Sequence, residues 1–482
     1  MQLPVKWPLS AVVVPTSLSR PDSVASERTG HHLYFRGGIA VVLTLGAAWG
    51  ALLLWRIASA GSFTAVGLQE VNAHGHAQIF GWVGLFVMGV ACFRLAWIKG
   101  VPAVSPGIAH ACFWLMLVGL ILRSLSQGAV DSAPWLLYPA VLGSVLEIGA
   151  IVGVGAIVIA TIRATGRFTP PDAFVVAAFG WFLLQAVYGT IYFVATTQAD
   201  SREGLVSLVA TWQAPLREMQ IYGFAMLMIF GVCQWILPKF FGFARISARR
   251  SWTALILINV GLIGMCVGLV LMRQFGHAWA GLWYLSAMLM TGGIVPLVLG
   301  FGVWRSTRVQ DRSLKYVRAA YSWLLISLAM LVALPLYQFV LLASIAPASQ
   351  AVEIGFSHAY YGAIRHAITV GFISLMIMGV AARMVSKPAA GSFQLPQSLW
   401  LPWLLVNAGC TIRVLGQITT DFTSMAFVIT GVSGLLELTG LAIWGAYIWR
   451  EMAAAKSSDR GPQGPALKRV NSGEYRFVTV PG

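Results

Sequence analysis

The chain has 482 residues, of which 58% are hydrophobic and only 10% are charged, and its formal net charge is +16. A soluble domain carries about 25% charged residues, so this composition excludes a soluble globular protein and indicates an integral membrane protein. Basic loops on the cytoplasmic side of a membrane explain the excess positive charge, and we expect no nucleic-acid partner. The five cysteines form no CxxC pair and therefore indicate no disulfide framework.

Composition divides the chain into three regions. Residues 1–36 are polar and proline-containing and lack the apolar core of a signal peptide, so we expect a cytoplasmic tail. Residues 37–452 contain apolar segments of the length that crosses a bilayer, about 20 residues each, and predict an all-α membrane domain of twelve transmembrane helices. Residues 453–482 are polar and predict a disordered cytoplasmic tail. The expected spans lie near 37–55, 72–95, 107–126, 137–162, 174–196, 216–237, 252–274, 280–304, 317–345, 360–385, 399–418 and 425–449.

Basic residues gather in alternate loops. They precede the first span and follow each even-numbered span, as at Arg163, Lys239 and Arg383, whereas the other loops are poor in lysine and arginine. Because cytoplasmic loops collect these residues, we expect both termini on the cytoplasmic side, with the lipid bilayer as a partner of the whole domain.

One pattern occurs three times and suggests an internal repeat. Each copy opens on an ionisable anchor, His76, Glu218 or His366, and continues into a glycine-rich apolar segment. The anchors are 142 and then 148 residues apart, an interval that corresponds to a multi-helix unit. We therefore expect three pseudo-symmetric four-helix repeats, each with its marked helix second. The expected repeats are about 37–163, 174–304 and 317–450.

Two more charged residues follow the first and last anchors at equal intervals, an arginine after 47 residues and a glutamate after 71. They are Arg123 and Glu147 in the first repeat, and Arg413 and Glu437 in the last. The arginine of the middle repeat, Arg273, follows its anchor by 55 residues, so we expect about eight extra residues there. An ionisable group inside a bilayer costs at least about 2.5–3.5 kcal/mol on insertion scales, and each one needs a partner or a function.

The histidines at the first anchor are expected on opposite faces of one helix. His74 and His76 are two residues apart, which separates them by about 200° around the helix axis, so they suit two different sites better than one. Neutral imidazole is an axial ligand of haem iron, and histidines from two helices can hold one macrocycle. His76 and His366 are equivalent in the repeat and are our candidate haem ligands. Hydrogen-bonded interhelical histidines are the alternative.

Further histidines are candidate metal ligands. His277 is expected in an outer loop and His358 just before the tenth span, where either would bind copper or a second haem from the outer side. The candidate metal ligands are therefore His74, His76, His277, His358 and His366. Surface histidine is the alternative for the two loop positions.

The buried charges suggest proton transfer and haem binding. Glu147, Glu218 and Glu437 are candidates for passing protons within the membrane. Arg123 and Arg413 would bind haem propionates, with extension toward the headgroups as the alternative. The sequence contains no CxxCH motif, so any haem b is expected to be non-covalent.

The third marked segment resembles the NnrS family of bacterial membrane proteins. It begins at His366 as His-Ala-Ile-Thr-Val-Gly and ends as Met-Gly-Val-Ala-Ala-Arg383, and that family carries a similar His-Ala-x-Thr-Val-Gly run with a Met-Gly-Val-x-x-Arg end. The His-x-His stretch followed by Phe-Gly is also similar. The resemblance implies a multi-pass protein of the bacterial inner (plasma) membrane that contains haem and copper and acts in the response to nitric oxide, in nitrosative stress and in denitrification. Ala77 replaces the acid usual in that family, and 385–391 lacks its usual histidine.

A wider similarity exists to subunit I of haem-copper oxidases and nitric-oxide reductases. Those proteins have twelve helices in three arcs of four, with haem ligands on the second and tenth. The similarity implies that His76 and His366 are the axial ligands of a six-coordinate haem. The oxidase copper site needs a histidine on the sixth helix and a pair on the seventh, whereas here the sixth carries Glu218 and Gln234 and the seventh has no histidine. We therefore expect no complete oxygen-reducing oxidase.

Three functions remain open from the sequence. The first is a haem-containing protein of the NnrS type with nitric-oxide or metal-nitrosyl chemistry, with a haem-dependent oxidoreductase among its forms. The second is a transporter, which internal repeats and intramembrane acids also suit. The third is an assembly or accessory factor for a respiratory oxidase or reductase, with quinol or another redox protein as a partner.

Overall fold

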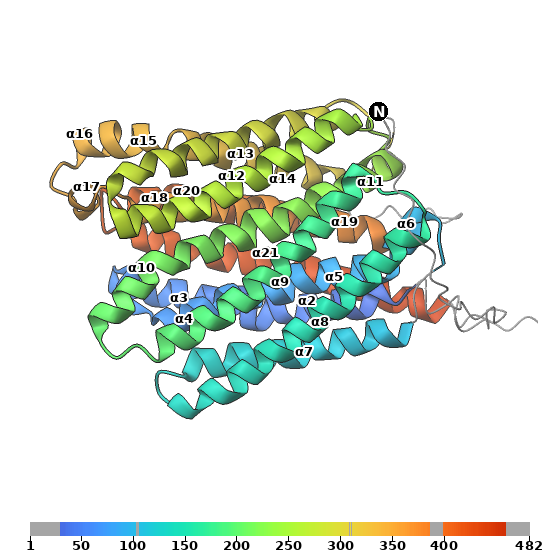
Figure 1. Cartoon of the computed structure of the whole chain (residues 1–482), viewed down its shortest axis with the longest axis horizontal. Helices are drawn as coiled ribbons and strands as arrows, with labels where there is room; N and C mark the ends of the chain where they lie inside the picture. The colour runs from blue at the N-terminus through green and yellow to red at the C-terminus, as the bar shows by residue number, and fades with distance from the viewer. Residues whose placement is uncertain (1–28, 103–105, 308, 310, 386–398, 459–482) are drawn as a thin grey trace, which may run out of the picture.

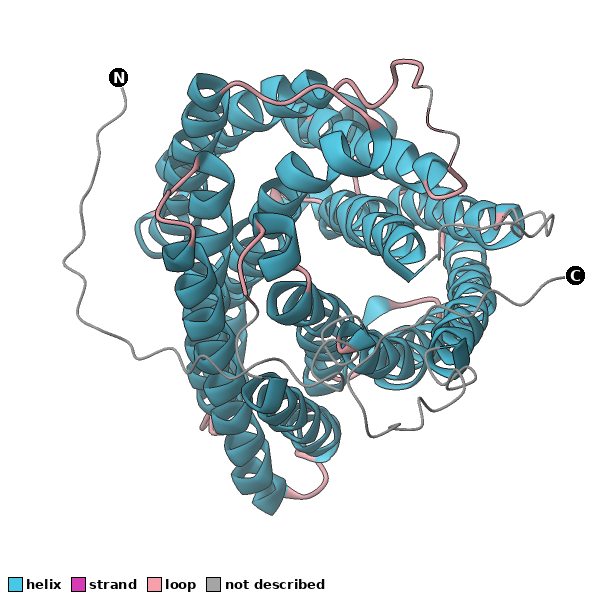
Figure 2. Ribbon diagram, turned by 90° about the vertical axis from the view of Figure 1, so that its right-hand side faces the viewer, coloured by secondary structure: helices cyan, strands magenta, loops and turns pink. Residues whose placement is uncertain are grey.

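The computed structural model describes residues 29–102, 106–307, 309, 311–385 and 399–458. Within these ranges all regular structure is helical, and the long helices run side by side in one bundle (Figure 1). Seen nearly along the helix axes, the helices lie in curved rows (Figure 2). Most of each expected tail, 1–28 of 1–36 and 459–482 of 453–482, lies outside the described residues.

Eleven helices of the described ranges are long and apolar enough to cross a membrane. In chain order they are α2 (His31–Val41) with η1 (Val42–Gly46) and α3 (Ala47–Ala60); α4 (Leu68–His76) with η3 (Ala77–Gly84) and α5 (Leu85–Phe93); α7 (Pro106–Ala129); η4 (Pro134–Leu136) with α8 (Leu137–Ala164); α9 (Pro170–Thr197); α10 (Arg202–Glu218) with η5 (Met219–Met226) and α11 (Leu227–Phe241); α12 (Ala248–Phe275); η6 (His277–Trp279) with α13 (Ala280–Phe301); α14 (Leu314–Val332); α18 (His358–His366) with η8 (Ala367–Ser374) and α19 (Leu375–Val385); and α21 (Ala426–Ser458). The remaining elements are η2 (Phe63–Ala65), α6 (Leu95–Lys99), α15 (Leu334–Leu336), η7 (Tyr337–Leu342), α16 (Ala343–Ile345), α17 (Gln350–Ile354) and α20 (Trp400–Thr419).

Two expected spans differ from the prediction in length or polarity. The segment expected at 399–418 forms α20, a helix of 20 residues that is not among the eleven, because Asn407, Arg413 and Gln417 lower its mean hydropathy. The ninth span breaks after Val332, where Pro335 has no amide hydrogen to continue the helical hydrogen bonds.

The first helix begins at 31 rather than 37, and the last one remains helical to 458. Eleven apolar helices identify a multi-pass membrane protein.

The three marked helices form the centre of the bundle. Their most apolar windows are 78%, 72% and 78% buried, in the order second, sixth and tenth expected span, whereas the other eight candidate spans are 33–44% buried. Each anchor is the last residue of an α-helix and is followed directly by a π-helix of eight residues: η3 after His76, η5 after Glu218 and η8 after His366. Because π-helical turns are rare and occur frequently at functional sites, this shared feature draws attention to the anchors.

Three helix pairs cross closely at glycines. At Gly119 of α7 and Gly261 of α12, a Cβ atom would lie 2.6 and 2.7 Å from backbone atoms of the neighbouring helix, and at Gly409 of α20 it would lie 2.7 Å from Glu437 Cγ. These three glycines are 142 and 148 residues apart, the same intervals as the anchors. A side chain larger than hydrogen would force these helices apart.

The glycine crossings correct the expected position of the middle arginine. Four residues after these glycines come Arg123 in α7, Met265 in α12 and Arg413 in α20. Arg273 lies eight residues beyond Met265 and is exposed, so the expected insertion in the middle repeat is wrong. On the partner helices, the residue at the crossing is Glu147, Met290 or Glu437. The middle crossing is therefore lined by methionines where the other two carry an arginine and a glutamate.

Candidate functional site between the inner helices

His74 and His366 belong to two inner helices, α4 and α18. Their charges lie close enough to interact. The Nδ1 atom of His74 lies 3.0 Å from the Gly46 carbonyl oxygen, and that of His366 lies 3.1 Å from the Gly362 carbonyl oxygen. A carbonyl oxygen only accepts, so Nδ1 donates in both rings and the neutral Nε2 keeps its lone pair. No hydrogen bond to either Nε2 occurs within the described part of the chain.

One glycine allows the His74 ring to approach α3, and another allows α18 to approach α20. A Cβ atom at Gly50 of α3 would lie 2.5 Å from His74 Cε1, and one at Gly362 would lie 2.2 Å from Gln417 Nε2. Trp82 Nε1 donates to Ser374 Oγ at 3.1 Å and joins η3 to η8. The two histidine-bearing helices are therefore held together by direct contact.

A buried arginine beside this histidine pair lacks hydrogen-bond partners. Arg413 is 5% exposed, and its charge interacts with both His74 and His366. Its Nε and Nη1 atoms have no partner among the described residues, and neither does Glu437 Oε1 opposite it. Buried donors of this kind are costly unless they meet an acceptor, and a carboxylate would fit the planar guanidinium.

His76 faces a different site. Its Nε2 atom lies 2.8 and 3.0 Å from the two carboxylate oxygens of Glu147 on α8, and its ring stacks on Phe80 at 4.0 Å between centroids. Arg123 donates through Nη1 to Gln127 Oε1 at 2.7 Å and lies over the Phe193 ring at 3.8 Å. The two histidines of the His-Gly-His stretch thus point to opposite sides of α4, as their spacing predicts.

Arg217 lies against the glycine between the two histidines. It packs on Gly75, where a Cβ atom would lie 2.9 Å from Arg217 Nη1. Its Nη2 donates to Asn72 Oδ1 at 2.7 Å and its Nη1 to Gln220 Oε1 at 2.8 Å. A third anchor site lies between α10 and α18, where Glu218 Oε1 accepts from the Tyr361 hydroxyl at 2.5 Å and from Arg365 Nη2 at 3.4 Å.

The structure therefore groups the candidate residues differently from the sequence pattern. It brings His366 together with His74 and Arg413, and it pairs His76 with Glu147 beside Arg123. The arginines at 217 and 365 were missed, although each stands directly before an anchor in the sequence. That shared position was the available signal.

His277, at the start of η6, and His358, at the start of α18, join no metal-binding group of described residues. His277 and His358 are exposed, and the His358 ring packs edge-on against Phe356 at 5.0 Å. Within the described ranges, no three histidine, cysteine, aspartate or glutamate side chains are grouped to hold a metal ion. The residues present therefore do not fit a copper site.

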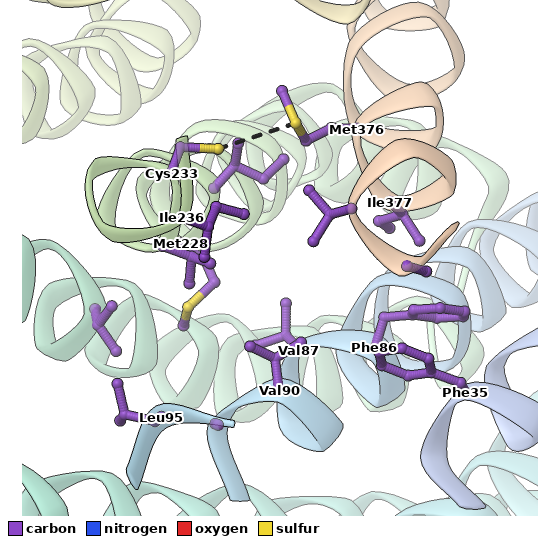
Figure 3. Close-up of a pocket in the computed structure, with 16 residues that line it drawn as sticks. Phe35, Phe86, Val87, Val90, Leu95, Met228, Cys233, Ile236, Met376 and Ile377 are labelled. Carbon is purple, nitrogen blue, oxygen red and sulfur yellow. Dashed lines mark hydrogen bonds between the residues drawn. The ribbon is translucent and has the colours of Figure 1, made fainter. Parts of the chain in front are cut away.

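An apolar cavity lies between the inner helices α5, α11 and α19 (Figure 3). Its volume is about 80 Å³, and its lining includes Phe86, Val90, Met228, Cys233 and Met376. A weak hydrogen bond joins Cys233 Sγ to Met376 Sδ at 3.9 Å. The lining side chains carry no nitrogen or oxygen atom, so this cavity suits a small apolar molecule rather than a haem or a metal ion.

The chain is similar in fold to a haem-copper oxidase. A chain of a haem-copper terminal oxidase, solved as a dimer by cryo-electron microscopy, matches 90% of this chain and 83% of its own length, with a TM-score of 0.60 and 14% sequence identity. At this identity the likeness concerns the fold alone. No protein-family model and no curated protein matches the chain.

Proposed function

We propose that the chain binds haem b non-covalently between α4 and α18, where His74 and His366 would hold the iron, and acts in the response to nitric oxide as a protein of the NnrS type. One observation carries the proposal: the imidazoles of His74 and His366 each donate through Nδ1 to a backbone carbonyl, and neither Nε2 has a hydrogen bond within the described ranges. Histidines that ligate metal generally use their second ring nitrogen in this way, because the bond fixes the tautomer and the ring orientation. This assignment replaces the expected His76 with His74.

The surroundings fit a porphyrin with propionates. Arg413 offers two buried donors without partners, and propionate carboxylates would accept from them. Gly50 of α3 leaves the His74 ring without a Cβ atom against it. When bound, the haem iron supplies one-electron redox chemistry and an affinity for nitric oxide.

The proposal assigns His76 a different role. Its Nε2 atom lies 2.8 Å from Glu147 Oε1, so we assign this pair, with Glu218 and its Tyr361 partner, to holding protons inside the membrane. Copper is left out because the described residues do not fit it.

The proposed architecture is that of twelve helices in three four-helix repeats. It is supported by the equal spacing of the anchors, the π-helices and the glycine crossings. In this arrangement α20 is the eleventh span, both termini are cytoplasmic, and the membrane is the bacterial inner membrane. A quinol or a redox protein would supply electrons.

A visible spectrum of the purified full-length protein tests the haem assignment. We expect a reduced-minus-oxidised spectrum with an α-band at the b-type position after expression with sufficient haem. The double substitution His74→Ala and His366→Ala should remove that band. The matched control is His110→Ala, because this helical histidine also donates through Nδ1 to a carbonyl four residues earlier, at 2.7 Å. Absence of the band from the wild-type protein, or its persistence in the double variant, contradicts the proposal.

The nitric-oxide role has its own test. Anaerobic addition of nitric oxide to the reduced protein should change the haem spectrum, and a nitric-oxide electrode should show whether the gas is consumed. Haem that is present and does not respond to nitric oxide would remove the nitric-oxide role while leaving the haem assignment in place.

A further inference from the structure

A groove lies between α12 and α13, far in sequence from the histidine anchors. Its volume is about 400 Å³, and Arg249, Arg250, Thr253, Leu257, Gly292 and Pro296 are among its lining residues. The arginines lie in the first turn of α12, whereas Leu257 lies two turns further along the same helix. The groove therefore has a cationic mouth and a less polar interior.

The mouth presents two positive charges without a carboxylate. Arg249 and Arg250 are both exposed, and no ion pair involves either of them in the described part of the chain. The side chain of Arg250 lies across α13, because a Cβ atom at Gly300 would be 2.5 Å from its Nη1 atom. Two arginines held at one end of a groove are a suitable site for a phosphate group.

The interior is shaped by glycines. A Cβ atom at Gly293 would lie 2.9 Å from Leu257 Cβ, so the two helices touch at the floor of the groove. The neighbouring Gly292 has nothing within 4 Å of its Cβ position, which leaves the space above the floor open. Pro296 also lines the groove and adds no hydrogen-bond donor on its backbone. An extended hydrocarbon chain suits this shape.

The groove opens toward the lipid. Thr253, Gly292 and Pro296 are exposed, and the adjacent face of α12 exposes Ile256 and Val260 at 58% and 52%. The arginines belong to the loop end at which basic residues gather, the expected cytoplasmic side. Each arginine near the surface of that leaflet raises the binding constant for anionic lipid roughly fivefold.

We propose that this groove binds one anionic phospholipid, with its phosphate between Arg249 and Arg250 and an acyl chain along Thr253, Leu257 and Gly292. Free phosphate shares the headgroup chemistry, but it leaves the apolar interior empty. The proposed lipid site is independent of the haem assignment.

Native mass spectrometry of the full-length protein in detergent tests the site. The protein is titrated with phosphatidylglycerol, with phosphatidylcholine and with inorganic phosphate. We expect one molecule of phosphatidylglycerol to bind saturably to each protein molecule, and we expect phosphatidylcholine to bind more weakly. The double substitution Arg249→Gln and Arg250→Gln should weaken that binding about 25-fold, from the factor for each arginine. The control, Arg163→Gln with Arg167→Gln, removes two basic residues from another loop at the same end.

A second pair of variants tests the interior without changing charge. Gly292→Leu should fill the groove and reduce lipid binding, whereas Gly281→Leu on the same helix should not, because nothing lies within 4 Å of its Cβ position either. Equal binding of phosphatidylcholine, displacement of the lipid by inorganic phosphate, or equal effects of the test and control variants would overturn the proposal.

Discussion

His74 and His76 are separated by one glycine, yet they belong to two regions with different chemistry. The His74 region contains two imidazoles whose Nδ1 atoms are bound to carbonyl oxygens, and a buried arginine with unpartnered donors. The His76 region is self-contained, because Glu147 lies within 3.0 Å of His76 Nε2 and Arg123 lies nearby. Arg123 Nε is unpartnered as well, so the two regions differ chiefly at the histidines: the Nε2 atom of His76 has a carboxylate partner, whereas His74 Nε2 and His366 Nε2 have none among the described residues.

The largest effect is expected when haem binding is compared between variants of His74 and His76. His74→Ala should lower the bound haem about tenfold or more, because it removes a proposed ligand. His76→Ala should keep most of the haem, since the His76 contacts are with Glu147 and Phe80. Haem per protein, measured by pyridine haemochrome and by absorbance, gives the comparison. The reverse order of effects would move the haem site to His76.

Removing the Glu147 carboxylate should destabilise the His76 region. Glu147→Ala leaves Arg123 and His76 buried without an acid, so we expect a loss of about 3–5 kcal/mol in the free energy of unfolding. Glu437→Ala is the matched control, because Glu437 Oε1 has no hydrogen-bond partner in the described ranges, and its loss should cost less. Unfolding by denaturant in mixed micelles measures both. Equal losses would show that the two regions do not differ in this way.

A methyl group tests how closely α3 must approach the first histidine. Gly50→Ala places a Cβ atom 2.5 Å from His74 Cε1, and such overpacking costs about 1–3 kcal/mol. We also expect a shift of the haem spectrum, because the ring must turn. Gly149→Ala, where the added atom meets open space, should change neither thermal stability nor spectrum.

The smallest effect is expected at the middle crossing. Met265→Leu conserves volume in an apolar contact and should cost less than about 1.5 kcal/mol. Arg413→Leu, at the corresponding position of the α20 crossing, should lower haem occupancy without comparable global unfolding. Thermal scans combined with haem quantification test both variants, and a haem loss in Met265→Leu would be evidence against the proposed difference between the crossings.

Much of the candidate site was accessible from the sequence. The anchors, Arg123, Arg413, Glu147 and Glu437 were found from their spacing alone, and they lie at helix crossings or beside the histidines. Spacing could not show that Met265 takes the arginine's place in the middle crossing. In the sequence alone, Arg273, eight residues beyond Met265, looks like the same arginine displaced by an insertion.

The sequence by itself determined that the chain lies in a membrane, because apolar segments of bilayer length must be helical to satisfy their own backbone hydrogen bonds. It also determined that two histidines one glycine apart point in opposite directions, since helix geometry alone sets that angle. Which groups contact them depends on the tertiary structure: the Gly46 carbonyl lies against His74, and Glu147 lies against His76. Those neighbours come from segments tens of residues away, and packing between helices, rather than any local propensity, brings them into contact.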